Sequence, residues 1–405
     1  MTINTDMLQK VTHILRDYFA AEVQIDRVDF LSEPDRRNKV VRLFLHSTSS
    51  LTPQSIILKQ SLPEESDSDD QDAYARYARD WAGLEFASIV QKNAHNVPRF
   101  YGGNQEYRMI LIEDLGEQHI SLVDSLTIRN PDKAISALSR FMTALGSFHA
   151  TSYGCTEQYE AILRGINPHA ETLQEDLNFV FSDVLSQLEL AHKNLGLHLS
   201  PACIDEAKGL IESVLKPGPF TALTHGDICP DNVFDHEDHR DLQLIDFEWA
   251  CVRSALLDGT YLRMSMPTCW CAKAIPVNII ESLECIYREE LKRTIPLAAD
   301  DLAYTTAYTE ACGFWVLQQT LHFINSTIDG DRVGPSGPTP EDSLWKAEEN
   351  WVRPRVLSRL QAFVDVATHY GQLPHLRQMA ELMLVTLRIR WPDTKSLEYY
   401  PAFMD

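Results

Sequence analysis

Apolar residues near the N-terminus recur at the spacing of one helix face. Within residues 5–19 they are Met7, Leu8, Val11, Ile14, Leu15 and Tyr18. Because positions three and four apart lie on the same side of an α-helix, the pattern predicts an amphipathic helix over 5–19. Short β-type segments follow near 24–31, 39–46 and 54–59. They predict a small, mainly antiparallel sheet.

Farther along, the patterns become helical. Amphipathic stretches cover residues 132–151, 170–194, 201–215, 276–293, 301–327, 343–368 and 372–390. Residues 329–342 contain three glycines and three prolines, which predicts a long loop between two helices. The chain as a whole is predicted to be an α+β protein, with a small antiparallel-sheet lobe in 1–115 and a large, mainly helical lobe in 116–405.

Two polar motifs lie close together in the second part. His-Gly-Asp-Ile-Cys-Pro-Asp-Asn occupies residues 225–232, and Leu-Ile-Asp-Phe-Glu occupies 244–248. Phosphoryl transfer needs a carboxylate to accept a hydroxyl proton, and an amide and a second carboxylate to hold Mg²⁺ against ATP phosphates. Asp227, Asn232 and Asp246 are the candidates for these roles.

The spacing of these motifs is compatible with that chemistry. Residues 242–247 have the alternation of a strand, and the acidic segment 235–241 is predicted to be the turn before it. The strand would return beside the loop that carries Asp227 and Asn232. Asp246 is therefore expected at a strand end near Asn232.

The order HGDxxxxN and then IDFE resembles the aminoglycoside phosphotransferase and choline/ethanolamine kinase superfamily. The resemblance implies a two-lobed, protein-kinase-like fold and an ATP-dependent small-molecule kinase, with GTP as an alternative donor. It implies Asp227 as the catalytic base, Asn232 and Asp246 as Mg²⁺ ligands, and His225 as a support of the catalytic loop. Asp258 resembles a position that braces the helical lobe.

The resemblance also directs attention upstream. A strand-type run ends near Lys59, and the helical pattern 81–92 carries Glu85, so Lys59 and Glu85 are predicted to form the ion pair that grips the phosphates. The segment 108–117 resembles the hinge between lobes. The carbonyl of Glu113 and the amide of Leu115 are expected to meet the adenine edge there.

One feature departs from protein kinases. No glycine precedes Gly83, so a Gly-rich loop over the phosphates is excluded. The side chains of Ser32 or Asn38, or the backbone amides of a wider turn, are expected to approach the phosphates instead. Charge would come from nearby basic residues, which are Arg36, Arg37 and Lys39.

Composition narrows the choice of partners. The net charge of −22 disfavours nucleic acid and mildly favours an amine-bearing acceptor. Part of that charge lies in residues 64–72, which are predicted to form a solvated loop. The chain shows neither a signal-peptide pattern nor an apolar run long enough to span a membrane, so a cytoplasmic protein without a membrane partner is expected.

The cysteines and tryptophans are less informative. The eight cysteines lack the paired spacing of zinc fingers, and the Cys-Trp-Cys at 269–271 is too isolated in the sequence for a zinc site. Reduced thiols are expected. Trp270 is a candidate for lining the acceptor pocket beside Glu248 and Asp231. Most of the C-terminal tryptophans, among them Trp315, Trp345 and Trp351, are expected in the core.

Two other functions stay open at this stage. A non-catalytic nucleotide-binding protein on the same fold would explain the missing glycine loop. A protein kinase is disfavoured because HGD replaces HRD, DFE replaces DFG, and an Ala-Pro-Glu segment does not follow.

Overall fold

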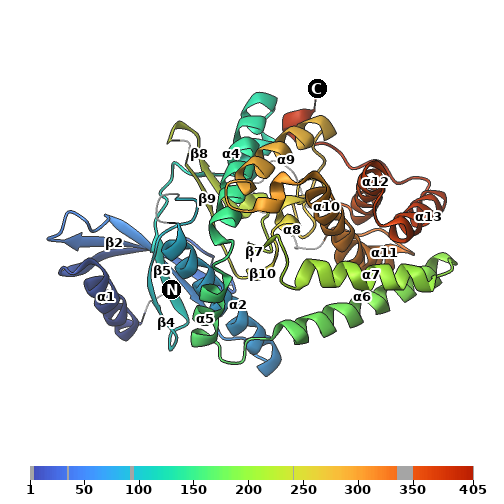
Figure 1. Ribbon diagram of the computed structural model, residues 1–405. Coiled ribbons are helices and arrows are strands. Elements are labelled where there is room, and N and C mark those ends of the chain that lie inside the picture. The colour runs from blue at the N-terminus through green and yellow to red at the C-terminus, as the bar shows by residue number, and fades with distance from the viewer. Residues whose placement is uncertain (1–3, 34–35, 92–94, 240, 335–349, 405) are drawn as a thin grey trace.

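We describe the protein from a computed structural model, which covers residues 4–33, 36–91, 95–239, 241–334 and 350–404 (Figure 1). A five-stranded antiparallel sheet and the helix before it form the N-terminal part. The strands, in spatial order, are β1 (Val23–Phe30), β2 (Asn38–Ser47), β3 (Ser55–Ser61), β5 (Met109–Glu113) and β4 (Phe100–Asn104). The predicted first helix is confirmed as α1 (Thr5–Phe19), and its buried residues Met7, Val11 and Leu15 share one core with the sheet.

Strand β3 lies in the middle of this sheet, and its register determines where Lys59 points. Lys59 is opposite Val40 of β2 and Ile110 of β5. Its neighbour Leu58 is fully buried in the core that includes α1. Since successive strand side chains point to opposite faces, Lys59 leaves the sheet on the face away from that core.

Helix α2 (Asp67–Val90) begins inside the acidic run that was predicted to be a loop. The hydroxyl of Ser66 caps it by accepting from the amide of Asp69 (3.1 Å), and acidic side chains occupy the first turn. Negative charge is stabilised at a helix N-terminus, which explains why so acidic a segment is helical. Asp70 also accepts two hydrogen bonds from the Arg108 guanidinium (2.6 and 2.7 Å). The prediction of a solvated loop over 64–72 was therefore wrong from residue 67 onward.

The remainder of the described chain is mainly helical (Figure 1). The helices are α3 (Leu122–Thr127), α4 (Pro131–Ser152), α5 (Thr156–Ile166), α6 (Leu173–Leu195), α7 (Pro201–Leu215), α8 (Leu256–Gly259), α9 (Val277–Leu291), α10 (Asp301–Trp315), α11 (Leu321–Thr327), α12 (Val352–Tyr370) and α13 (Pro374–Arg390). The short strands are β6 (Ile120–Ser121), β7 (Thr221–Thr224), β8 (Val233–His236), β9 (Asp241–Leu244) and β10 (Cys251–Ser254). The predicted α+β class, with a small antiparallel sheet and a large helical part, is confirmed.

Some predicted boundaries differ from the structure. The helix expected over 301–327 is interrupted by a π-helical turn at Val316–Thr320. Residues 335–349, which include most of the predicted loop 329–342 and the start of the helix 343–368, lie outside the described residues. No helix in the described ranges combines the length and hydropathy that crossing a bilayer requires.

Candidate active site

The hairpin of β8 and β9 brings the two predicted metal ligands together. Val233 pairs with Leu244, and the ladder continues one residue further, because the amide of Ile245 donates to the carbonyl of Asn232 (3.0 Å). Asn232 therefore lies beside the residue that precedes Asp246. The turn predicted over 235–241 is shorter than expected, since its first two residues belong to β8.

The catalytic loop begins after β7 and is held by Asp258. The carboxylate of Asp258 accepts from the amides of His225 (2.6 Å) and Gly226 (3.3 Å) and pairs with His149 (3.2 Å). Burial alone would raise the pKa of Asp258, but the hydrogen bond and charge of His149 lower it below its usual value. Asp258 thus stays ionised as an acceptor for the loop's backbone amides.

His225 and Gly226 shape the turn before Asp227. The His225 Nε2 atom donates to the carbonyl of Ile245 (2.8 Å), which ties the loop to the strand that carries Asp246. Gly226 adopts φ +82°, and a Cβ at this position would lie 2.2 Å from the carbonyl oxygen of Trp249. Only glycine fits both this conformation and so close an approach.

Asp227 is partly buried and held by several donors. Its Oδ1 accepts from the Thr268 hydroxyl and from the Cys229 thiol (3.2 Å). The Tyr261 hydroxyl in turn hydrogen-bonds to Thr268. The Asn232 amide nitrogen donates to the backbone carbonyl of Asp227 (2.9 Å), so the side-chain oxygen of Asn232 is the atom left to bind a cation. Thr268 was not predicted, because no motif marks it.

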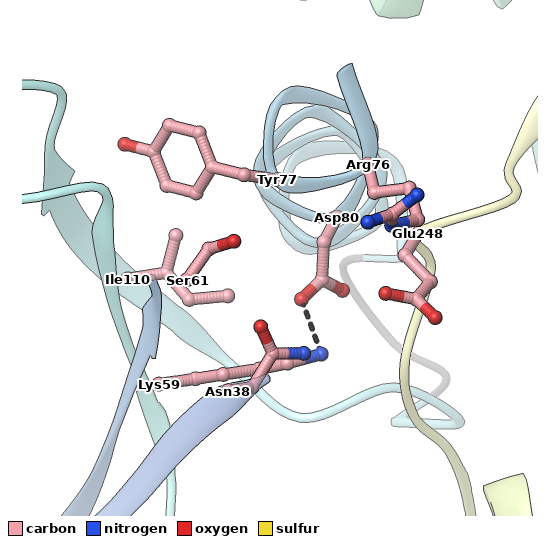
Figure 2. A pocket seen from close by; sticks show the side chains of 8 residues that line it. All are labelled: Asn38, Lys59, Ser61, Arg76, Tyr77, Asp80, Ile110 and Glu248. Atoms are coloured by element: carbon pink, nitrogen blue, oxygen red, sulfur yellow. Dashed lines mark hydrogen bonds and ion pairs between the residues drawn. The ribbon is translucent and has the colours of Figure 1, made fainter. Parts of the chain in front are cut away.

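Lys59 extends from the sheet to Asp246. Its Nζ atom lies 2.5 Å from Oδ1 of Asp246 and 2.7 Å from Oδ2 of Asp80 on α2. Figure 2 shows Lys59 and Asp80 meeting in a pocket that Asn38 and Glu248 also line. Burial alone would lower the pKa of Lys59, but the carboxylates of Asp246 and Asp80 raise it well above its usual value. Burial would raise the pKa of Asp246, but Lys59 lowers it.

The predicted partner of Lys59 was wrong. Glu85 accepts a hydrogen bond from the indole N–H of Trp81 (2.6 Å), whereas Asp80 accepts from Lys59 and from the amide of Phe247 (2.8 Å). The signal for Asp80 is present in the sequence. Asp80 lies at helical spacing from Ala73, Tyr77, Leu84 and Ala87, which are buried like Asp80 itself. A buried acidic residue needs a partner, whereas Glu85 is only half-buried.

The contact between Lys59 and Asp80 should stabilise the fold. Asp80→Asn should lower the free energy of unfolding by about 1–3 kcal/mol, because Lys59 loses one of its two charged partners in a buried site. Glu85→Gln, the matched control on the same helix, should stay within about 0.5 kcal/mol of the original protein. Urea unfolding at pH 7 measures both variants. Equal losses, or a larger loss for Glu85→Gln, would contradict the assignment of Asp80.

The turn between β1 and β2 contacts the same site. One nitrogen of the Arg37 guanidinium donates to both carboxylate oxygens of Glu248 (2.6 and 3.0 Å). Asn38 lines the pocket beside Lys59, whereas the Ser32 hydroxyl accepts from the amide of Val40 (3.0 Å). The contact between Arg37 and Glu248 thus joins the residue before β2 to the motif at 244–248. The approach of this turn to phosphate, through any of its side chains, stays a prediction.

The predicted hinge lies at the end of β5. Glu113 is opposite Ile56, and its amide donates to the carbonyl of Arg99 (2.9 Å). The carbonyl of Leu115 accepts from Nδ1 of His119 (2.7 Å). The pairing of the Glu113 carbonyl and the Leu115 amide with adenine stays a prediction, as does a lobe boundary after residue 115.

Trp270 lies beside Asp231 as expected, and its role in an acceptor pocket stays a prediction. The indole N–H of Trp270 donates to the carboxylate of Asp231 (2.8 Å), and Trp270 packs against the main core. Trp315 is buried as expected, whereas Trp351 is 43% exposed. Trp345 lies outside the described residues.

Comparison with known proteins identifies the class of this fold and site. The ecdysteroid kinase-like family matches residues 70–297, more than half of the chain, and the chain belongs to this family. The matched span contains Asp227, Asn232 and Asp246, whereas Lys59 precedes it. The resemblance to small-molecule kinases is thereby confirmed. Comparison with curated proteins gives no match.

Several solved structures are similar at low identity. An ethanolamine kinase of Plasmodium vivax shares 12% identity, with 87% of this chain and 84% of that chain covered at a TM-score of 0.44. A choline kinase from Streptococcus pneumoniae shares 10% identity, with 90% of this chain and 100% of that chain covered at a TM-score of 0.39. An amicoumacin kinase, in complex with AMP-PNP and Ca²⁺, shares 12% identity, with 94% of this chain and 93% of that chain covered at a TM-score of 0.41.

Proposed function

We propose that the protein transfers the γ-phosphate of ATP to a hydroxyl group of a small molecule. The observation that carries the proposal is a series of contacts that links a carboxylate, an amide, a second carboxylate and a lysine from the sheet. The Asn232 side chain donates to the carbonyl of Asp227 (2.9 Å), and the carbonyl of Asn232 accepts from the amide of Ile245 (3.0 Å). The next residue, Asp246, has its Oδ1 atom 2.5 Å from Nζ of Lys59. Each group has the chemistry that phosphoryl transfer requires.

Asp227 is proposed as the base that orients the acceptor hydroxyl and accepts its proton. Its Oδ1 accepts hydrogen bonds from Thr268 and Cys229, and Oδ2 is 3.5 Å from the Asn232 amide. These donors hold the carboxylate in one orientation. Positioning of this kind supplies much of the rate in phosphoryl transfer.

The oxygen atoms of Asn232 and Asp246 fit a hard divalent cation such as Mg²⁺. When bound, the cation would neutralise charge on the ATP phosphates. Lys59 carries a positive charge in the same pocket, because its carboxylate neighbours raise its pKa. Arg37 and Asn38 place the β1–β2 turn beside Lys59 and Glu248, which supports a role for this turn where other kinases use glycines.

The acceptor is proposed at the level of a class. The family description suggests ecdysteroids, which are polyhydroxylated steroids. The net charge of −22 instead favours amine-bearing acceptors such as aminoglycosides, amino sugars or choline-like alcohols. Trp270 is compatible with a cation–π site, because its N–H donates to Asp231 in the ring plane and the side chain is only partly buried.

A panel of these acceptors with ATP and Mg²⁺ tests the proposal. We expect one class to yield a phosphomonoester, visible by ³¹P NMR, together with stoichiometric ADP. Macrolides and a generic protein substrate serve as comparison acceptors. Tight nucleotide binding without transfer to any acceptor and without hydrolysis would favour the non-catalytic alternative, whose support is the missing glycine loop. Labelling of the protein substrate alone would favour a protein kinase.

A further inference from the structure

Three thiols and one carboxylate meet beside the catalytic loop, and we call them the thiol cluster (Cys229, Asp231, Cys269 and Cys271). The Sγ atoms of Cys229 and Cys269 and a carboxylate oxygen of Asp231 all lie within 4.8 Å of one another. The Sγ atom of Cys271 is 2.7 Å from that of Cys269. All three cysteines are at most 3% exposed. The Cys-Trp-Cys pair that is isolated in the sequence thus gains two neighbours from the catalytic loop.

The carboxylate of the cluster has a free acceptor. Oδ2 of Asp231 accepts from the Trp270 indole (2.8 Å), whereas Oδ1 is buried and has no hydrogen-bond partner within the described residues. Buried carboxylate oxygens are nearly always hydrogen-bonded or bound to a cation. The unpartnered oxygen is therefore available as a ligand atom for a cation.

Two buried guanidiniums contact the segment that leads into the thiol cluster. Arg355 and Arg359 are fully buried and donate to backbone carbonyls of residues 264–267, which precede Thr268 and Cys269. In the part of the chain that the structure describes, none of their hydrogen-bond acceptors is a carboxylate. A buried positive charge is costly without a nearby anion. Cation-bound thiolates in the cluster would supply that anionic charge.

We propose that the thiol cluster binds one zinc-class divalent cation. Thiolate sulfur is the preferred ligand of Zn²⁺, and structural sites take four ligands in a tetrahedron. At Zn–S distances of ~2.3 Å, tetrahedral sulfur ligands are roughly 3.8 Å apart, so Cys269 and Cys271 must separate by about 1 Å. The three thiol protons leave to solvent as the sulfur–metal bonds form, so Cys229 no longer donates to Asp227, whose Oδ1 keeps the Thr268 hydroxyl as its donor. Four ligand anions are then balanced by the cation and the two guanidiniums.

This site is distinct from the proposed magnesium site. Sulfur ligands select a soft cation, whereas the oxygens of Asn232 and Asp246 suit a hard one. The zinc-class cation would tie the catalytic loop to the segment 264–273, next to the Thr268 hydroxyl that donates to Asp227. The proposal stands or falls independently of the phosphotransferase activity, because its test measures metal binding.

Cobalt binding to the full-length chain tests the proposal directly. Reduced, metal-free protein titrated with Co²⁺ should develop the intense visible bands of a tetrahedral site and a thiolate-to-cobalt charge-transfer band, saturating at one equivalent. Zn²⁺ should displace the cobalt, whereas excess Mg²⁺ should not. Cys269→Ser and Cys271→Ser should weaken Zn²⁺ affinity by more than the ~10–100-fold that loss of an outer-shell partner costs. Cys312→Ser, at a fully buried cysteine in α10, is the matched control and should bind like the original protein.

Two outcomes would overturn the proposal. One is a wild-type Co²⁺ spectrum without tetrahedral or charge-transfer bands, a measurement that needs no variant to fold. The other is a non-reducing mass that is two hydrogens lower, with peptide mapping that joins Cys269 to Cys271, in protein that was never exposed to an added oxidant.

Discussion

Replacing Asp227 by asparagine should lower kcat for phosphate transfer by about 10²–10⁴-fold, the usual contribution of a positioned general base. Asparagine keeps the size of the side chain and can still accept from Thr268 and Cys229, but it cannot take the proton of the acceptor hydroxyl. Nucleotide affinity should be nearly unchanged, because the proposed phosphate and metal contacts are made by Lys59 and Asp246. Steady-state rates of ADP release and calorimetric titration with ATP give the two values.

The matched control for this variant is Asp238→Asn. Asp238 is an exposed acidic residue in the 3₁₀ turn Glu237–His239, between β8 and β9 of the same hairpin. It should leave both rate and affinity unchanged. An Asp227→Asn protein with near-normal turnover would remove Asp227 from the role of base.

The second large effect is expected at Asp246. Asp246→Asn removes a carboxylate ligand of the proposed Mg²⁺ site, and a bound metal contributes several kcal/mol. Mg²⁺-dependent nucleotide affinity should therefore fall by about 100-fold or more, at 1.4 kcal/mol for each factor of ten. The fold should survive, because Lys59 retains Asp80 at 2.7 Å. Calorimetric titration of ATP with Mg²⁺, and with EDTA in place of Mg²⁺, measures the effect.

The titrations with EDTA distinguish a lost metal ligand from a lost fold as the cause of weaker nucleotide binding. In the original protein, removal of Mg²⁺ should weaken nucleotide binding to about the level of the variant. In Asp246→Asn, adding or removing Mg²⁺ should make little difference. A variant whose nucleotide affinity still rises strongly with Mg²⁺ would show that Asp246 is not a metal ligand.

Local patterns predicted much of the fold. The spacing of Met7, Val11 and Leu15 predicted α1, and the β-type runs predicted the first three strands of the sheet. These elements follow from one-face periodicity, which a sequence displays directly. The acidic start of α2 was not predicted, because charge density suggested a loop, whereas the Ser66 cap and the helix dipole stabilise a helix there.

Some site residues were predicted and others were missed, because a sequence displays local spacing directly but does not display contacts between distant segments. Asp227, Asn232 and Asp246 lie within two motifs joined by a hairpin, so their proximity followed from strand pairing. The choice between Asp80 and Glu85 depended on which of the two is buried. The helical spacing of Asp80 from Tyr77 and Leu84 was in the sequence but was not used. The catalytic loop also lies beside Thr268 and the cysteines at 269 and 271, which are distant from it in the sequence. The spacing of residues in the sequence does not reveal such contacts.

An experimental structure of the full chain with a non-hydrolysable ATP analogue and Mg²⁺ tests most directly whether this site performs phosphoryl transfer. We predict a Mg²⁺ ion bound by the side-chain oxygens of Asn232 and Asp246, Lys59 against the phosphates, and the γ-phosphate facing Asp227. A nucleotide bound elsewhere, or a phosphate-bound metal that neither Asn232 nor Asp246 contacts, would contradict the proposed function.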